Sequence, residues 1–348
     1  TAYMNVCVIG SGGREHAICF KLKQSVKLNN LFCMPGNAGT AMICQNLDVD
    51  ILNFEEIYKT LKKYSIELVV VGPEIPLVAG IVDYLENKGI KVFGPSMKAS
   101  QLEGSKIFMK NFCKKFNIPT AKYFEVKSLT EAKKVLSEFN TPIVVKSDGL
   151  AAGKGVTICN SINEALDDIG EIMSGKFQSS NKVIIEEFLK GEEASYFVIT
   201  DGKNFQQVGT AQDHKRVGEN DTGLNTGGMG AYSPSLIINK KIEEKILDKI
   251  IQPTINGMKE LGHPYTGILY AGLMIHEDEP KLIEYNIRFG DPECQALMMR
   301  LKTDLLDLIN FTINQKLNEI KIHWSENPSI TVVAASQGYP GKFKKDIE

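Results

Sequence analysis

The amino-terminal part of the chain alternates between short apolar runs typical of buried strands and segments with helical spacing. Residues 5–9 predict a strand that ends at Gly10, and residues 14–23 predict a helix directly after it. The alternation continues with a strand at 68–71, a helix at 77–88 and a strand at 91–93. Because strands that alternate with helices pair in parallel, this region predicts a Rossmann-like α/β domain.

The first strand-to-helix turn carries a glycine-rich loop, Gly10-Ser-Gly12-Gly13-Arg14-Glu15-His16. Its spacing is similar to that of a dinucleotide-binding turn, but Glu15 stands where that pattern has its third glycine. Residues 31–35, where a second strand would end, also lack the carboxylate that binds a ribose. The loop therefore favours a single phosphate held by backbone N–H groups and Arg14, and a turn that needs glycine only for packing is the alternative.

From Gly104 onward the pattern changes to a compact α+β arrangement. The sequence predicts a lysine-rich helix over 105–116, ended by Asn117-Ile118-Pro119. Further helices and strands are expected at 121–126, 129–139, 143–145, 155–159, 162–173 and 183–188. Two hairpins follow, one with strands 195–200 and 206–210 and one with strands 267–276 and 280–287.

A strand end with a second glycine-rich loop follows the β-branched run at 143–145, reading Lys146-Ser-Asp-Gly-Leu-Ala-Ala-Gly-Lys-Gly-Val156. Its glycines let backbone N–H groups approach an anion, and its two lysines add positive charge: Gly149, Gly153 and Gly155, with Lys146 and Lys154. The spacing is not that of a Walker loop, because Gly155 follows Lys154 where a Ser or Thr is needed. A nucleotide-phosphate clamp is the hypothesis, and a hairpin tip with solvated lysines is the alternative.

An acidic strand forms a second candidate site near residue 285. Side chains two apart share a strand face, so the polar ones are expected on one face and the apolar ones on the other: Glu284, Asn286 and Arg288 against Ile283, Tyr285 and Ile287. The oxygen donors suit magnesium, and the turn that follows adds the carboxylates of Asp291 and Glu293. The strand therefore predicts a metal-phosphate site, with a half-exposed ion pair as the alternative.

A long polar loop forms the third candidate site. It contains Gln212-Asp213-His214-Lys215-Arg216 and then the glycine-dense stretch from Asp221 to Ala231. Loops of this length inside compact domains are usually functional or disordered. The mixture of acids, bases, amides and glycines favours a substrate loop.

Composition excludes several classes of protein. A net charge of -2 and a pI near 6.3 give no electrostatic footprint for nucleic acid or a membrane. No apolar run reaches the length of a transmembrane helix. The seven cysteines are scattered and odd in number, which fits a reducing cytoplasm rather than a disulfide framework or a zinc site.

In chain order these motifs resemble the ATP-grasp superfamily, and the longer strings resemble its phosphoribosylamine-glycine ligase family. The resemblance runs from Val6 to about Gly341 and rests on Val8-Ile-Gly-Ser-Gly-Gly-Arg-Glu-His16, Pro35-Gly-Asn37-Ala-Gly-Thr40, Gly72-Pro-Glu74, Gln212-Asp-His-Lys215, Asn225-Thr-Gly-Gly-Met-Gly-Ala-Tyr-Ser-Pro234 and Arg288-Phe-Gly-Asp-Pro-Glu293. It implies an α/β and α+β multidomain fold, with a Rossmann-like amino-terminal parallel sheet followed by an ATP-grasp core.

The domains that the resemblance implies are a substrate-binding domain at 1–103, a catalytic core at 104–122 and 192–328, a lid at 123–191 and the incomplete start of a carboxy-terminal domain at 329–348. The implied reaction joins glycine to 5-phosphoribosylamine through glycyl phosphate, giving glycinamide ribonucleotide, ADP and phosphate in purine biosynthesis. ATP is the implied co-substrate and Mg²⁺ the implied metal, with Mn²⁺ as an alternative. A cytoplasmic monomer that acts on small molecules is expected.

The resemblance also implies roles for residues. ATP would be bound by Lys106, Lys146, Gly149, Gly153, Lys154, Gly155, Glu186, Glu187, Phe188, Leu189 and Glu193, and the metal by Glu284 and Asn286. The other substrates would be bound by Gly12, Gly13, Arg14, Glu15, Asn37, Glu74, Asn225, Gly227, Gly228 and Arg288. The residues expected to act in catalysis are Lys146, Arg288, Asp213 and Lys215.

Overall fold

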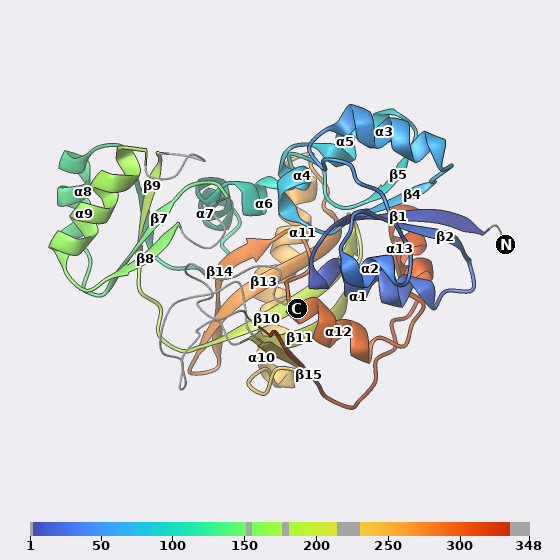
Figure 1. The fold of residues 1–348 in the computed structure, drawn as a ribbon. Coiled ribbons are helices and arrows are strands. Elements are labelled where there is room, and N and C mark those ends of the chain that lie inside the picture. Colours follow the sequence, from blue (N-terminus) through green and yellow to red (C-terminus); the bar gives the residue numbers. More distant parts are fainter. Residues whose placement is uncertain (1–2, 151–154, 176–180, 214–229, 335–348) are drawn as a thin grey trace.

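Three β-sheets organise the computed structural model, which describes residues 3–150, 155–175, 181–213 and 230–334 (Figure 1). Two of the sheets pack together in the larger part of the molecule. The third forms a smaller lobe at one end, drawn in green in Figure 1.

The amino-terminal sheet has five parallel strands in the order β3-β2-β1-β4-β5. Its strands are β1 (Met4–Gly10), β2 (Leu28–Pro35), β3 (Gln45–Asn46), β4 (Leu68–Val71) and β5 (Lys91–Phe93). The helices between them are α1 (Gly13–Lys23), α2 (Ala38–Ala41), α3 (Phe54–Lys63), α4 (Glu74–Val78) and α5 (Ile81–Asn87). The predicted parallel α/β region is confirmed.

One predicted helix is wrong in its extent. The single helix expected at 77–88 is two helices, α4 and α5, because Gly80 between them adopts a left-handed conformation with φ of 96°. Glycine reaches that region without a steric penalty, so it breaks the helix here. Periodicity alone does not reveal such a break, since apolar residues continue on both sides.

The central sheet has six antiparallel strands in the order β14-β13-β10-β11-β12-β15. They are β10 (Glu192–Asp201), β11 (Phe205–Asp213), β12 (Gly230–Ser233), β13 (Thr266–His276), β14 (Glu279–Asn286) and β15 (Ser329–Val332). Both predicted hairpins, β10 with β11 and β13 with β14, are confirmed.

Alternate residues of β10 enter two different cores, as expected for a strand with period two. Tyr196 and Val198 pack in the core that includes α10 (Lys240–Ile246), the π-helical turn η2 (Leu247–Ile251) and α11 (Gln252–Glu260). Phe197 and Ile199 pack in the core that includes α12 (Glu293–Arg300), α13 (Leu305–Ile313) and the 3₁₀ turn η3 (Leu317–Glu319). Residues of the amino-terminal sheet enter both cores, so the two sheets form one packed body.

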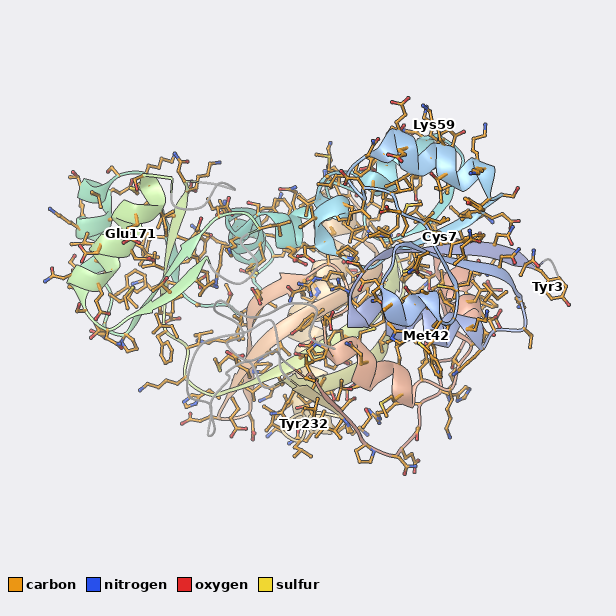
Figure 2. The ribbon with its side chains drawn as sticks, in the orientation of Figure 1. Tyr3, Cys7, Met42, Lys59, Glu171 and Tyr232 are labelled. Atoms are coloured by element: carbon orange, nitrogen blue, oxygen red, sulfur yellow. The ribbon has the colours of Figure 1, made fainter. Side chains whose placement is uncertain are left out.

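The lid sheet has four antiparallel strands in the order β6-β9-β7-β8. They are β6 (Tyr123–Val126), β7 (Ile143–Ser147), β8 (Val156–Cys159) and β9 (Val183–Glu187). The helices α8 (Leu129–Leu136) and α9 (Ile162–Met173) cover one face and share a separate small core with it. Figure 2 shows Glu171 on the outer side of this lobe, whereas Cys7 lies inside the main body.

Two short helices join the main body to the lid, α6 (Gln101–Gly104) and α7 (Lys106–Lys115). Within the described residues, no helix combines the length and the apolar character needed to cross a membrane.

Candidate functional site

The lid sheet turns one face toward its helices and the other toward α7. Ile143, Val145 and Ile185 fill the lid core. In the antiparallel register Val144 lies opposite Glu186 and Lys146 lies opposite Ile184, so Lys146 and Glu186 share the other face. This alternation explains how two charged residues end on a buried sheet surface.

The helix α7 presents lysines to that face. Lys106 and Lys110 are four residues apart and therefore lie on one side of the helix. The Lys106 ammonium donates to the backbone carbonyls of Ser147 at 2.7 Å and Gly149 at 3.2 Å. Burial lowers the pKa of Lys106, while Glu284 raises it and Lys146 lowers it further. The lid strand β7, the α7 helix and β14 therefore meet at this lysine.

Glu186 joins two of the lysines. Its Oε1 lies 2.5 Å from the Lys110 ammonium and its Oε2 lies 2.7 Å from the Lys146 ammonium. The three side chains are almost fully enclosed, with exposed fractions of 4% for Glu186, 0% for Lys110 and 6% for Lys146. Burial acts to raise the pKa of Glu186, but the two ammonium groups outweigh it and hold the pKa below its usual value. A desolvated carboxylate shared by two lysines leaves a net positive charge, which suits a polyphosphate.

Asp148 fixes the start of the clamp against α7. Its Oδ1 accepts hydrogen bonds from the backbone N–H groups of Lys106 at 2.6 Å and Ile107 at 3.2 Å. A carboxylate at a helix N-terminus satisfies unpaired N–H groups and interacts favourably with the helix dipole. This contact positions Lys146, two residues earlier, next to the α7 lysines.

The segment after β9 links the lid to the central sheet. The Glu187 carboxylate accepts from the backbone N–H of Lys122 at 2.9 Å, and the Phe188 side chain is exposed. Glu193 lines a pocket together with Glu284. Of the residues assigned to nucleotide binding by resemblance, Glu186 to Leu189 and Glu193, the Glu186 side chain enters the lysine cluster and Glu193 lies in the pocket with Glu284.

A β-bulge corrects one part of the expected pattern in β14. Tyr285 and Ile287 pack in the core as predicted, and the Tyr285 hydroxyl lies 2.6 Å from Thr254 Oγ1. Ile283 does not join them, because the register with β13 shifts after Leu282 and places Ile283 in the pocket beside Glu284. A strict period of two does not anticipate this shift.

Glu284 and Asn286 offer one carboxylate and one amide oxygen, the donor types that magnesium prefers. The Asn286 oxygen also accepts from Arg288 at 3.4 Å. Within the described part of the chain, no group of three or more His, Cys, Asp or Glu side chains is arranged to hold a metal ion. These residues fit a magnesium ion that takes most of its ligands from phosphate and water.

The glycine-rich loop after β1 surrounds a buried carboxylate. Glu15 fills the space beside Gly10 and Gly72, where any Cβ would overlap its carboxylate, and it accepts from the Gly12 N–H at 3.2 Å. Gly10 also has φ of 133°, which favours glycine. The missing third glycine is thus explained, because a carboxylate occupies the place where a dinucleotide-binding turn needs room.

Arg14 uses its guanidinium inside the protein. It donates to Glu15 at 2.9 Å and to the Phe289 carbonyl at 3.1 Å, and its backbone N–H approaches Asp291 Oδ2 at 3.4 Å. Gln295 donates to the other Asp291 oxygen at 2.8 Å. Asp291, which the sequence grouped with the metal-phosphate site, instead lies at the start of α1.

Asn37 ties the loop to the start of α2. Its amide donates to the carbonyls of Ser11 at 3.0 Å and Gly12 at 3.2 Å, and its oxygen accepts from the Thr40 N–H at 2.9 Å. The structure therefore brings Asn37 together with Gly12 and Gly13 at the carboxyl edge of the parallel sheet. In open α/β sheets, ligands bind at this edge.

Arg288 joins the amino-terminal loop to the acidic strand. Its guanidinium donates to Glu74 at 3.1 Å and to Glu103 at 3.4 Å. Burial acts to raise the pKa of Glu74, but Arg288 and other groups hold it below its usual value. For Glu103 burial wins and the pKa rises to about 7, although Arg288 acts to lower it. Glu103 also accepts from the Ile287 N–H at 2.9 Å.

Several predicted residues lie outside the described part of the structure: Gly153, Lys154, Lys215, Asn225, Gly227 and Gly228. For Asp213 only the backbone is described, paired with Ala231. Sequence reasoning missed Lys110, Asp148 and Glu103. The four-residue spacing from Lys106 would have indicated Lys110.

The comparisons with known proteins agree along the chain. Residues 4–103 match the family model "Phosphoribosylglycinamide synthetase, N domain", and residues 104–294 match "Phosphoribosylglycinamide synthetase, ATP-grasp (A) domain". The phosphoribosylamine–glycine ligase of Brucella melitensis biotype 1 is 50% identical over 343 residues, which cover 98% of this chain and 80% of the relative. That of Rhizobium meliloti is 49% identical and covers 99% of this chain and 81% of the relative.

Solved structures give the same picture. The phosphoribosylamine–glycine ligase of Thermotoga maritima superposes with a TM-score of 0.85 at 32% identity, covering 98% of this chain and 82% of that one. A biotin carboxylase domain of the Hydrogenobacter thermophilus 2-oxoglutarate carboxylase, in complex with MgADP, gives a TM-score of 0.73 at 19% identity, covering 95% of this chain and 74% of that one. At that identity the second likeness concerns the fold alone.

Proposed function

The chain belongs to the phosphoribosylglycinamide synthetase family, and we infer that it catalyses the ATP-dependent ligation of glycine to 5-phosphoribosylamine in purine biosynthesis. The products are glycinamide ribonucleotide, ADP and phosphate. The observation that carries this inference within the structure is the convergence of Lys106, Lys146 and Glu284 on one site between lid and core.

We propose that the first step is attack of the glycine carboxylate on the γ-phosphate of ATP, giving glycyl phosphate and ADP. Negative charge moves toward the leaving oxygen of ADP, and the ammonium groups of Lys106 and Lys146 stabilise it. Positioning and charge stabilisation account for such a reaction without a nucleophilic side chain. The Gly149 to Gly155 segment and Glu186 to Leu189, with Glu193, are proposed to hold the nucleotide.

Glu284 and Asn286 are proposed to hold Mg²⁺ or Mn²⁺ together with the ATP phosphates. When bound there, the metal supplies positive charge to the triphosphate. Arg288, next to Asn286, is proposed to bind the glycine carboxylate, with Asp213, Lys215, Asn225, Gly227 and Gly228 as the substrate loop.

The second step is proposed to join the two halves of the site. The amine of phosphoribosylamine attacks the carbonyl carbon of glycyl phosphate, the C–O bond to phosphate breaks, and the amine loses a proton. The phosphate of this substrate is proposed to lie at the N-terminus of α1, beside Gly12 and on the N–H group of Gly13. Arg14 fixes the loop through Glu15, while Asn37 and Glu74 are proposed to lie near the ribose.

The domain division follows the same logic. We propose a substrate domain at 1–103, a core at 104–122 and 192–328, a lid at 123–191, and the start of a further domain at 329–348, whose strand β15 pairs with β12 of the core. A monomer in the cytoplasm is proposed too. All seven cysteines are free thiols, which supports a reducing compartment.

ADP formation tests the proposed function. The chain is incubated with ATP, Mg²⁺, glycine and freshly prepared phosphoribosylamine, and each substrate is omitted in turn. We expect catalytic formation of ADP only when both glycine and phosphoribosylamine are present. ADP formation that requires bicarbonate instead of glycine would assign the chain to another carboxylate ligase.

A further inference from the structure

Lys110 is a wholly buried lysine that the proposed reaction does not use. Its ammonium contacts Glu186 Oε1 at 2.5 Å, Thr120 Oγ1 at 2.7 Å and the Ala121 carbonyl at 3.5 Å. The ring of Tyr123 lies beneath it, with the centroid 5.8 Å away. Protein groups therefore surround this ammonium, and its side chain has no exposed surface.

A chain of contacts also fixes Lys110 to the core. Thr120, which accepts from Lys110, donates to the Leu282 carbonyl at 2.7 Å. Leu282 is in β14, two residues before Glu284. Lys146 lies in the lid strand β7, so the two lysines that share Glu186 belong to different parts of the fold.

The sharing of Glu186 has a consequence for phosphate binding. To contact a triphosphate, Lys146 must give up part of its pairing with Glu186. If Lys146 were the only partner, this exchange would leave a buried carboxylate without a counterion, which is strongly unfavourable. Lys110 remains on the other carboxylate oxygen and removes that penalty.

We propose that Lys110 is a positioning residue that keeps Glu186 neutralised, so that the Lys146 ammonium is free to move onto the phosphates of ATP. The proposal rests on the proposed function for the identity of the ligand. It concerns nucleotide binding only, so it is measured without glycine or phosphoribosylamine.

The test is a double-variant cycle with MgATP as the probe, read by calorimetry on the whole chain. Lys110→Met removes the charge at similar volume and is expected to weaken MgATP binding by about tenfold to a hundredfold. Glu186→Gln in the same chain removes the stranded carboxylate, so the double variant is expected to bind MgATP more tightly than Lys110→Met alone. The matched control is Lys114→Met, an exposed lysine of the same helix, which is expected to bind as the unaltered chain does.

If Lys110 has only a structural role, the double variant is expected to bind MgATP more weakly than Lys110→Met does. The second substitution would then weaken binding further, and that result overturns the proposal, as does unchanged MgATP affinity in Lys110→Met. If Lys110→Met does not fold, the double variant decides, since it carries no unpaired carboxylate: a folded double variant that fails to bind MgATP contradicts the proposal. If the variants bind MgATP in the expected order but the unaltered chain forms no ADP with glycine and phosphoribosylamine, the proposed function is rejected and the role of Lys110 is not.

Discussion

The two charged regions of the molecule differ in how their positively charged side chains are neutralised. At the lid, Lys110 and Lys146 share the single carboxylate of Glu186, and Lys106 is held by neutral carbonyls. In the arginine region, formed by the amino-terminal loop and the segment after β14, Arg14 pairs with Glu15 and Arg288 pairs with Glu74 and Glu103. The lid region has positive charge to give to an anion, whereas the arginine region is already balanced.

This difference in neutralisation predicts different functions for the two regions. Flexible ammonium groups can leave a shared carboxylate for a phosphate, which suits a site where charge develops during reaction. Planar guanidinium groups held by carboxylates and carbonyls act as joints between the amino-terminal sheet and the segment after β14. A phosphate at the arginine region must then rely mainly on backbone N–H groups.

The largest effect is expected at the lid. Lys146→Met should lower the rate of ADP formation by on the order of a thousandfold, because it removes a desolvated charge from the reacting phosphates. Steady-state ADP production measures it, with circular dichroism to verify the fold. The exposed Lys127→Met variant is the control and should retain full activity. Near-normal turnover in a folded Lys146→Met chain would remove the distinction between the regions.

In the arginine region, the main expected effect of a substitution is a loss of stability. Arg14→Met leaves Glu15 buried without its counterion and should lower the free energy of unfolding by about 3 kcal/mol. Denaturant titration measures this change. The Michaelis constant for phosphoribosylamine should rise while that for ATP stays unchanged. A defect confined to ATP, or unaltered stability, would contradict the role of a joint.

The sequence predicted the regular parts of this molecule because they follow one local rule at a time. The parallel region, both hairpins and the helix 162–173 came from periodicity and turn residues. The break at Gly80 and the bulge beside Ile283 did not, since each depends on backbone geometry that periodicity does not encode.

The same holds for the site. Lys146 and Glu284, which the sequence predicted for it, both act on the pKa of Lys106. The pairing of Glu186 with Lys110, and the position of Asp291 at α1, join residues that are distant in sequence. Such contacts arise from the packing of the lid and the sheets, so no local sequence motif predicts them.

A third prediction concerns pH. Burial raises the pKa of Glu103 from 4.5 to about 7, so the folded chain binds this proton more tightly than the unfolded chain. The stabilisation from this group is therefore present in full below pH 4.5 and is lost as pH rises through 7. Its amplitude is about 3 kcal/mol, at about 1.4 kcal/mol for each pKa unit.

Glu103→Gln should remove that pH dependence while its oxygen still accepts from the Ile287 N–H. Free energies of unfolding at several pH values measure it, with the exposed Glu67→Gln variant as the control. If the free energy of unfolding of Glu103→Gln depends on pH as that of the unaltered chain does, the pKa of Glu103 is not raised in the folded chain.

The smallest effect is expected at the acidic strand. Glu284→Gln keeps the shape and removes one metal-binding charge, so it should raise the Mg²⁺ concentration for half-maximal ADP formation by about tenfold. Tyr285→Phe, whose ring faces the core on the opposite side, should leave the Mg²⁺ requirement unchanged. It should cost about 1 kcal/mol of stability through the lost contact with Thr254. The reverse assignment of the two effects would place the metal elsewhere.

The central claim is that the glycine carboxylate attacks the γ-phosphate of ATP beside the lid lysines, whereas the amino-terminal glycine-rich loop holds the phosphate of phosphoribosylamine. Glycine labelled with ¹⁸O in its carboxylate tests this directly, with mass analysis of the released phosphate. The account predicts that each phosphate carries one ¹⁸O atom from glycine, because the bridging oxygen of glycyl phosphate leaves with phosphorus. Product formation with unlabelled phosphate would contradict it.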